Sequence, residues 1–421
     1  MKIVVVGGGS TYTPELADGF ARLYGQLPLE ELVLVDVPAA ADRLSLVGGV
    51  SARILSRLGH PGRVVTSVAL DEALEGASAV LLQLRVGGQA ARHSDETFPL
   101  MCGCVGQETS GAGGLAKALR TVPVVLDIAE RVRHVAPEAW IVDFTNPVGI
   151  VTRALLDAGH RAVGLCNVAK GFQHTFGDWL GADPEEVELD HVGLNHLTWE
   201  LGVRVRGEDV MPELLAQHAD SLAARCMLPV DVLERLGVIP SYYLRYYYGH
   251  DRVVEEQRSA PSRAEAVTEL EKQLLALYAD PTLDTKPALL GERGGTYYSE
   301  AAVALVGGLL RDTGSTQVAN VRNGRTLPFL PERAVIEVPC RIGAAGAEPL
   351  PVAELDPLYA GLIAHVSAYE ELAVRAAVEG GVERVERALL AHPLIGQIGP
   401  ARELAAELVT RNADFLPWAA R

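Results

Sequence analysis

The chain has 421 residues, of which 48% are hydrophobic and 22% charged, as is typical of a globular enzyme with a sizeable core. Its formal net charge of -17 argues against nucleic acid and anionic membranes as partners, because a negative field repels both. Five cysteines in so long a chain do not suggest a disulfide framework, and the apolar run after Lys2 is too short for a signal peptide. We therefore expect a cytoplasmic protein without a membrane span.

The first residues combine a buried strand with a glycine-rich turn. Residues 2–6, KIVVV, are a continuous apolar run typical of a strand buried on both faces of a parallel sheet. A helix is predicted from about Pro14 to Tyr24. Between the two lie five small residues, namely Gly7, Gly8, Gly9, Ser10 and Thr11. Small residues let the backbone approach a pyrophosphate, whose charge the helix N-terminus stabilises. The order predicts dinucleotide binding, although Tyr12 replaces the third glycine of the usual fingerprint.

The second predicted strand, Leu32 to Val35, ends at Asp36. An acid at this place can bind the two ribose hydroxyls, which favours NAD over NADP. An ordinary strand–helix turn without a cofactor is the alternative. Further strands are predicted at Arg63–Val68, Ala79–Leu84, Ala139–Phe144 and Arg161–Leu165, with helices at Ala40–Leu58, Leu115–Val135 and Val148–Ala158 between them. This alternation predicts a Rossmann-like, doubly wound parallel sheet, similar to that of lactate and malate dehydrogenases, over residues 1–185.

Polar residues follow several of these strands, at the edge where such sheets bind ligands. They are Arg85, Asn146, Cys166 and Asn167. The segment from Arg92 to Gly114 is polar and glycine-rich, which suits a loop that closes over a bound cofactor or substrate.

After about residue 185 the pattern changes to short alternating segments mixed with long helices, such as Arg263 to Tyr278. We expect an α+β domain at 186–421 that carries substrate and metal sites and mediates self-association, as a homodimer or homotetramer. Most tyrosines of residues 240–248, PSYYLRYYY, are expected to be core or interface aromatics. One of them, near a metal or an arginine, could have a lowered pKa and act as a base.

Cys166 ends an apolar strand, and His196 ends a second segment, GLNH. Thiolate and imidazole both bind divalent transition metals, and two protein ligands leave positions open for a substrate. Isolated cysteines and histidines are more often packing residues, so this pair predicts a metal site only together with its context.

Taken together, the motifs resemble those of glycoside hydrolase family 4, the NAD- and metal-dependent glycosidases, over nearly the whole chain. The motifs are GGGSTYTPEL, RVGG, RHSDE, GQETSGAGG, TNPVG, CN, GLNH, PSYYL and RGGTYYSEAA. The family departs from the two-carboxylate scheme of most glycosidases. The pair CN resembles the 6-phospho-β-glucosidase type, which typically reads CNVP, whereas here Ala169 replaces the proline.

The resemblance implies a role for each residue that matches a motif. Cys166 and His196 match the metal ligands, usually for Mn²⁺, although a thiolate would also accept zinc, cobalt or iron. Tyr243 matches the base that removes the proton from sugar C2, with its neighbour Tyr242 as the competing assignment. Arg92 and Arg263 match substrate-binding arginines, and Arg263 is the candidate for the 6-phosphate, since a guanidinium suits phosphate. The residues implied near the sugar hydroxyls, the metal or the pocket are Glu108, Asn146, Asn167 and Arg293.

The implied reaction hydrolyses phosphorylated disaccharides or aryl 6-phospho-β-glucosides with no net redox change. NAD takes a hydride from C3, which makes the C2 proton acidic. The base removes that proton, the aglycone leaves C1, water adds, and the same NADH reduces C3. No proton donor to the leaving group is identified.

Three alternatives remain. A family member of other specificity could act on unphosphorylated, α-linked or galactoside substrates, although Asp or His, rather than Asn167, usually follows the cysteine there. A 2-hydroxy-acid dehydrogenase shares the fold and the Asn-Pro motif, and Asp190 with His191 could supply its acid–histidine couple. A non-enzymatic NAD sensor would need neither metal ligand nor base.

Overall fold

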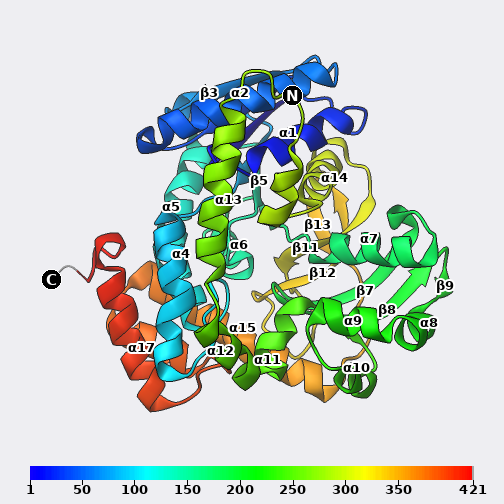
Figure 1. Ribbon diagram of the computed structural model, residues 1–421, viewed down its shortest axis with the longest axis vertical. Coiled ribbons are helices and arrows are strands. Elements are labelled where there is room, and N and C mark those ends of the chain that lie inside the picture. The colour runs from blue at the N-terminus through cyan, green and yellow to red at the C-terminus, as the bar shows by residue number, and fades with distance from the viewer. Residues whose placement is uncertain (420–421) are drawn as a thin grey trace.

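Six parallel strands form the N-terminal half of the sheet in this computed structural model, which describes residues 1–419 (Figure 1). They are β1 (Lys2–Val6), β2 (Glu31–Val35), β3 (Arg63–Ser67), β4 (Ala79–Leu82), β5 (Trp140–Asp143) and β6 (Ala162–Gly164). Their order, β6-β5-β4-β1-β2-β3, is that of dinucleotide-binding folds, with the reversal of direction beside β1. The predicted doubly wound sheet is therefore confirmed.

Helices connect and cover these strands because each carries an apolar face. They are α1 (Thr13–Arg22), α2 (Ala41–Arg57), α3 (Leu70–Leu74), α4 (Gly88–Thr97), α5 (Gly111–Val135) and α6 (Val148–Asp157). The prediction of a loop from Arg92 to Gly114 is wrong in part, because much of this segment is helical. It contains most of α4, the 3-10 helix Phe98–Cys102 and the start of α5. Buried ion pairs hold α4: Arg92 Nε lies 2.7 Å from Glu96 Oε1, and Asp95 binds Arg120 of α5. Such pairs leave no apolar periodicity in the sequence.

Seven further strands continue the same sheet in antiparallel fashion. They are β7 (Val187–Leu194), β8 (Leu197–Val205), β9 (Glu208–Asp209), β10 (Ile239–Pro240), β11 (Ser315–Arg322), β12 (Val335–Gly343) and β13 (Gly346–Pro349). The join is made by β11, which pairs with β6 on one side and β12 on the other. The main hydrophobic core contains residues from both halves of the chain, and a smaller core lies under α7 to α10. The predicted division at residues 185 and 186 stays a prediction.

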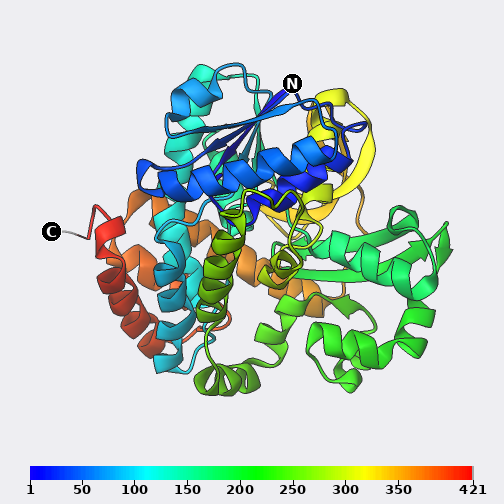
Figure 2. The same ribbon diagram turned by 45° about the horizontal axis from the view of Figure 1, so that its top comes forward.

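Helices of varied length follow α6 along the chain. They are α7 (Val168–Leu180), α8 (Met211–Gln217), α9 (Ala219–Cys226), α10 (Val230–Leu236), α11 (Arg245–Tyr248), α12 (His250–Ser259), α13 (Arg263–Tyr278), α14 (Tyr298–Arg311), α15 (Pro357–Glu379), α16 (Val382–Leu390) and α17 (Ile398–Arg411). Helix α13 packs against both α2 and α4, and thereby ties the second half of the chain to the nucleotide-binding half (Figures 1 and 2). Within residues 1–419, no helix combines the length and apolar character needed to span a bilayer.

Candidate active site

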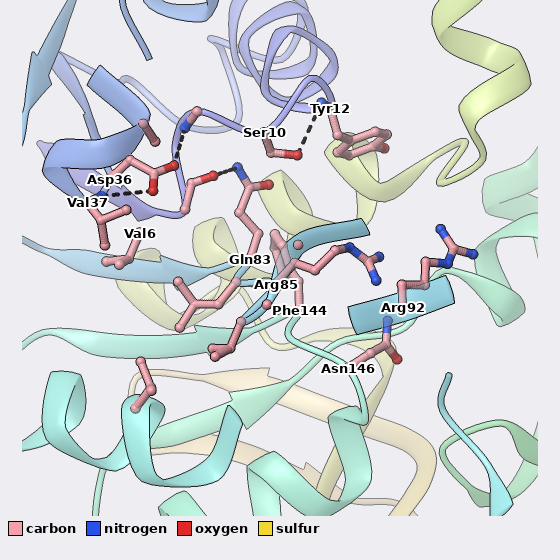
Figure 3. Close-up of a pocket in the computed structure, with 18 of the residues that line it drawn as sticks. Val6, Ser10, Tyr12, Asp36, Val37, Gln83, Arg85, Arg92, Phe144 and Asn146 are labelled. Carbon is pink, nitrogen blue, oxygen red and sulfur yellow. Dashed lines mark hydrogen bonds between the residues drawn. The ribbon is translucent and has the colours of Figure 1, made fainter. Parts of the chain in front are cut away.

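A cavity of about 940 Å³ opens at the carboxyl ends of β1, β2 and β4. Its wall includes Asp36 and Val37 at one end and Arg92 and Asn146 at the other (Figure 3). This is the crevice in which doubly wound sheets bind their ligands. Its volume is within the range that accommodates a cofactor-sized ligand.

The glycine turn after β1 fits a dinucleotide closely. A Cβ atom at Gly7 would lie 2.7 Å from the carbonyl oxygen of Gln83, and one at Gly8 would lie 2.7 Å from Leu34 Cβ. The backbone of Gly7 also has φ +84°, which favours glycine. Because side chains are excluded there, the backbone is free to approach a pyrophosphate.

Asp36 stands at the ribose end of this crevice. Its Oδ2 accepts a hydrogen bond of 2.9 Å from the Gly9 backbone N–H (Figure 3). Gly7, Gly9 and Ser10 line the cavity with it, whereas Gly8 and Thr11 are buried behind the lining. The donors and the acid that a dinucleotide requires are therefore present in one place.

At the other end, the buried carboxylate of Glu108 is surrounded by three cations. Lys117 Nζ lies 2.6 Å from its Oε2, Arg92 Nε lies 3.2 Å from its Oε1, and Arg85 binds both oxygens. Burial alone would raise the pKa of Glu108, but the charges of Lys117, Arg85 and Arg92 hold it well below its ordinary value. The anionic form of Glu108 is therefore favoured, and it organises a positively charged wall. Its predicted catalytic role stays a prediction.

Glu108→Gln should lower the free energy of unfolding by about 3–5 kcal/mol, because it leaves buried cations without their counter-charge. The depressed pKa means that Glu108 stabilises the fold above pH 4.5, its unfolded value, and that this contribution is lost as pH falls through the folded value. Urea unfolding of both proteins between pH 3 and 8 checks this. The difference should be largest at neutral pH and shrink towards the acid end; a difference independent of pH would contradict the assignment.

Cys166 and His196 are both buried and reach the same part of the site from different strands. Cys166 follows β6, and His196 sits in the tight turn between β7 and β8 with φ 62°. The His196 ring stacks on the Tyr243 ring with centroids 3.6 Å apart. His196 and Tyr243 line the cavity, whereas Cys166 is buried behind the lining. Burial, and then the nearby Cys166, raise the pKa of Tyr243, opposite to the lowered pKa that the sequence suggested for a base.

The tautomer of His196 suits a metal ligand. Thr109 Oγ1 donates to Gln107 Oε1 at 2.8 Å, so it accepts from His196 Nδ1–H at 2.9 Å. That arrangement leaves the lone pair of Nε2 free. Burial lowers the pKa of His196 to about 4, which keeps the ring neutral. Within residues 1–419 no cluster of three or more His, Cys, Asp or Glu side chains is arranged for a metal, so Cys166 and His196 would leave positions open for substrate oxygens.

The remaining predicted residues fall into two groups. Asn146, Asn167 and Arg293 line the cavity, and Asn146 Oδ1 is buried and finds no hydrogen-bond partner among residues 1–419. Arg263 is different: it is exposed at the start of α13, does not line the cavity, and donates to the backbone carbonyl of Glu292 at 2.7 Å. The structure therefore does not bring Arg263 together with the other predicted substrate residues.

Sequence reasoning did not single out several charged residues of the site, among them Glu271, Arg43 and Lys117. Glu271 of α13 binds Arg293 at 3.1 Å and Arg43 at 3.4 Å, and Arg43 Nε donates to the Gly9 carbonyl at 2.6 Å. Charges on an amphipathic helix such as α13 look solvated in sequence, so no signal marked Glu271. Lys117 did leave a signal, since it and Arg120 are cations among the small and apolar residues of the first half of α5.

His191, the acid–base candidate of the dehydrogenase alternative, lies outside the cavity lining. It is buried between two carboxylates, with Glu200 Oε1 at 2.7 Å from Nδ1 and Glu337 Oε1 at 3.1 Å from Nε2. Asp190 instead pairs with Arg204. The couple that a hydroxy-acid dehydrogenase needs is therefore not formed at the cofactor crevice.

Comparison with known proteins agrees with this geometry. Models of the family 4 glycosyl hydrolases match residues 2–182, and those of the family's C-terminal domain match residues 191–395. A Bacillus subtilis protein named "Probable 6-phospho-beta-glucosidase" is 37% identical, with 99% of this chain and 97% of the relative covered. The Escherichia coli 6-phospho-beta-glucosidase is 35% identical, with 99% and 96% covered.

The fold matches as closely as the sequence. The structure of the Thermotoga maritima 6-phospho-beta glucosidase with manganese, NAD⁺ and glucose-6-phosphate superposes with a TM-score of 0.93 at 32% identity, over 99% of each chain. Full-length similarity at this level, together with the matched family models, excludes the alternatives of a hydroxy-acid dehydrogenase and a non-enzymatic NAD sensor. The chain belongs to glycoside hydrolase family 4.

Proposed function

We propose that the chain hydrolyses 6-phospho-β-glucosides by oxidation at C3, proton abstraction at C2 and elimination of the aglycone, with NAD and Mn²⁺ as cofactors. One observation carries the proposal: a single cavity joins a glycine-lined nucleotide crevice to His196 and Tyr243. A hydrolase needs a dinucleotide beside a metal ligand and a base only if it oxidises its substrate temporarily. The Escherichia coli relative is named a 6-phospho-beta-glucosidase, and the Thermotoga maritima structure contains manganese, NAD⁺ and glucose-6-phosphate.

Different residues of the chain would bind the dinucleotide, bind the metal and act as the base. The backbone of the glycine turn and Asp36 hold the dinucleotide, and Cys166 with His196 would hold the metal. When bound, these groups supply a reversible hydride acceptor at C3 and a positive charge that polarises the sugar oxygens. Tyr243 stacks on His196 and lines the cavity, which supports its hydroxyl as the C2 base. Tyr242 is exposed and does not line the cavity, so Tyr243 is the better assignment.

The positively charged wall supports a phosphorylated substrate. Arg92 lines the cavity, and its side chain is 13% exposed, whereas Arg263 is turned towards backbone carbonyls outside. Arg85 and Lys117 add charge that Glu108 only partly cancels. A planar guanidinium in such a setting suits a phosphate dianion. We therefore assign the 6-phosphate to Arg92 in place of Arg263.

The cellular setting belongs to the proposal as well. All five cysteines are described and are free thiols, which supports a reducing cytoplasm. Self-association as a homodimer or homotetramer stays a prediction, and size-exclusion chromatography with light scattering would test it.

Asp36→Ala should raise the Kd for NAD about 10- to 100-fold, because the variant loses charged hydrogen bonds to the ribose worth about 1.5–3 kcal/mol. Asp42→Ala is the matched control, since Asp42 is an exposed acid on α2 and its loss changes the net charge equally. Isothermal titration calorimetry with NAD compares the two. Equal Kd values for both variants would place the ribose elsewhere.

The reaction itself is tested with p-nitrophenyl 6-phospho-β-glucoside and reduced, purified protein. NAD, Mn²⁺ and reductant are omitted in turn, and the α-linked and unphosphorylated glycosides are run in parallel. We expect p-nitrophenol release that requires NAD and Mn²⁺ and is confined to the phosphorylated β-glycoside. Release from the α-linked or unphosphorylated compound instead would retain the family chemistry and overturn the proposed specificity.

A further inference from the structure

Cys166 and His196 approach the site from strands that are not neighbours. In the sheet order, β6, which precedes Cys166, and β7, which precedes His196, are separated by β11 and β12. These two strands come from residues 315–343, far from both ligands in the sequence. The spacing between the two ligands is therefore set by the strands inserted between them.

One row of residues crosses all four strands directly beneath the ligands. Its members are Gly164 on β6, Asn320 on β11, Glu337 on β12 and Gly193 on β7. Gly164 lies two positions before Cys166, and Gly193 lies just before the turn that carries His196. The outer members are glycines because a Cβ at Gly164 would lie 2.8 Å from Asn320 Cβ, and one at Gly193 would lie 2.0 Å from the Leu197 carbonyl oxygen.

The buried Glu337 carboxylate connects this row to both ligands. Its Oε2 accepts from Asn320 Nδ2 at 2.7 Å and from Asn195 Nδ2 at 3.0 Å. Asn195 is the neighbour of His196 in the β7–β8 turn. Burial and then the Glu337 charge raise the pKa of the Cys166 thiol, and the nearby Asn195 side chain acts in the opposite direction as a hydrogen-bond partner. Asn195 thus adjoins one ligand in the chain and lies near the other, and Glu337 holds its amide.

The other oxygen of Glu337 is held equally firmly. It lies 3.1 Å from His191 Nε2, and the opposite nitrogen of that ring lies 2.7 Å from Glu200 Oε1. Burial alone would lower the pKa of His191, but Glu200 and Glu337 raise it to about 10, so an imidazolium stands between two carboxylates. A buried carboxylate is costly unless it is paired, and that of Glu337 has three partners, namely Asn320, Asn195 and His191.

We propose that Glu337 is a positioning residue that, through Asn195, sets the mutual geometry of Cys166 and His196. The proposal rests on the proposed function, since it presumes that these two residues bind the metal. Partners of this kind behind a metal centre typically contribute about 10- to 100-fold to metal affinity. Glu337 touches no substrate and no cofactor crevice, because it does not line the cavity.

Glu337→Gln and Glu200→Gln form a matched pair that isolates this role. Both residues are buried, both bind His191, and both variants remove one negative charge, but only Glu337 bonds Asn195 and Asn320. Mn²⁺ binding is measured on the reduced, full-length proteins by the EPR signal of free Mn²⁺. Circular dichroism checks folding, and the thiolate charge-transfer band of bound Co²⁺ reports Cys166 ligation.

We expect Glu337→Gln to raise the Kd for Mn²⁺ about 10- to 100-fold and to weaken the Co²⁺ thiolate band. Glu200→Gln should bind both metals much as the wild-type protein does. The Kd for NAD should be the same in the wild-type protein and in both variants. Asn195→Ala should reproduce the effect, and it serves as the test if Glu337→Gln does not fold. Unchanged Mn²⁺ affinity in the folded variants, or an equal loss in Glu200→Gln, would overturn the proposal. If the wild-type protein bound no Mn²⁺, the metal site of the proposed function would be overturned. The positioning role of Glu337 would then be overturned with it, since Cys166 and His196 would bind no metal.

Discussion

Tyr243→Phe should lower kcat for the 6-phospho-β-glucoside by about 10²- to 10⁴-fold, the usual contribution of a positioned acid–base group. The variant loses only the hydroxyl, and the phenyl ring can still stack on His196 as the tyrosine ring does at 3.6 Å. The Kd values for NAD and Mn²⁺ should therefore stay close to those of the wild-type protein. Steady-state kinetics and calorimetric titration of the same preparation measure both quantities.

Tyr242→Phe is the matched control for this experiment. Tyr242 adjoins Tyr243 but is 38% exposed and faces Arg245 rather than the cavity. Its variant should keep nearly full activity. If Tyr242→Phe lost activity and Tyr243→Phe kept it, the base would be Tyr242, and the stacking of Tyr243 on His196 would be a packing contact.

Cys166→Ser should abolish metal-dependent hydrolysis, with Mn²⁺ affinity lowered by about 100-fold or more. A serine hydroxyl stays protonated at neutral pH and cannot replace a thiolate ligand. His196 alone would then hold the ion, because the residues described here bring no third ligand to the pair. Equilibrium dialysis with Mn²⁺, followed by the hydrolysis assay over a range of metal concentrations, measures the loss.

Cys226→Ser provides the comparison. Cys226 is fully buried at the end of α9, and its thiol donates to the Pro240 carbonyl at 3.1 Å, a bond that a serine can also make. This variant should bind Mn²⁺ like the wild-type protein. Activity of Cys166→Ser that still responds to Mn²⁺ at wild-type concentrations would show that the metal binds elsewhere.

The parts of the fold that the sequence predicts are those encoded by local patterns. The continuous apolar run of β1, the glycines after it and Asp36 at the end of β2 all lie within one βαβ unit, so their spacing alone defines the cofactor crevice. The helix Arg263–Tyr278 was also predicted with its observed bounds, and in the structure Ser262 marks its start by forming a capping box with Glu265.

The parts that the sequence does not predict depend on contacts between distant segments. The insertion of β11 and β12 between β6 and β7 joins residues more than a hundred positions apart, and no local periodicity encodes that order. Arg263 is a second example: the residue matches a motif, but its guanidinium donates to the Glu292 carbonyl of the 3-10 helix Ala288–Arg293 and does not line the cavity. Side-chain direction is set by such tertiary contacts rather than by the motif.

The most direct test of the account follows hydrogen at sugar C2 during turnover. The phosphorylated β-glycoside is prepared with deuterium at C2, hydrolysed in ordinary water with NAD and Mn²⁺, and the glucose 6-phosphate formed is analysed by NMR spectroscopy and mass spectrometry. If Tyr243 removes the C2 proton, the product carries solvent hydrogen at C2, and Tyr243→Phe abolishes both exchange and hydrolysis. Product that keeps all of its deuterium at C2 would contradict the proposed reaction and would indicate direct displacement at C1 instead.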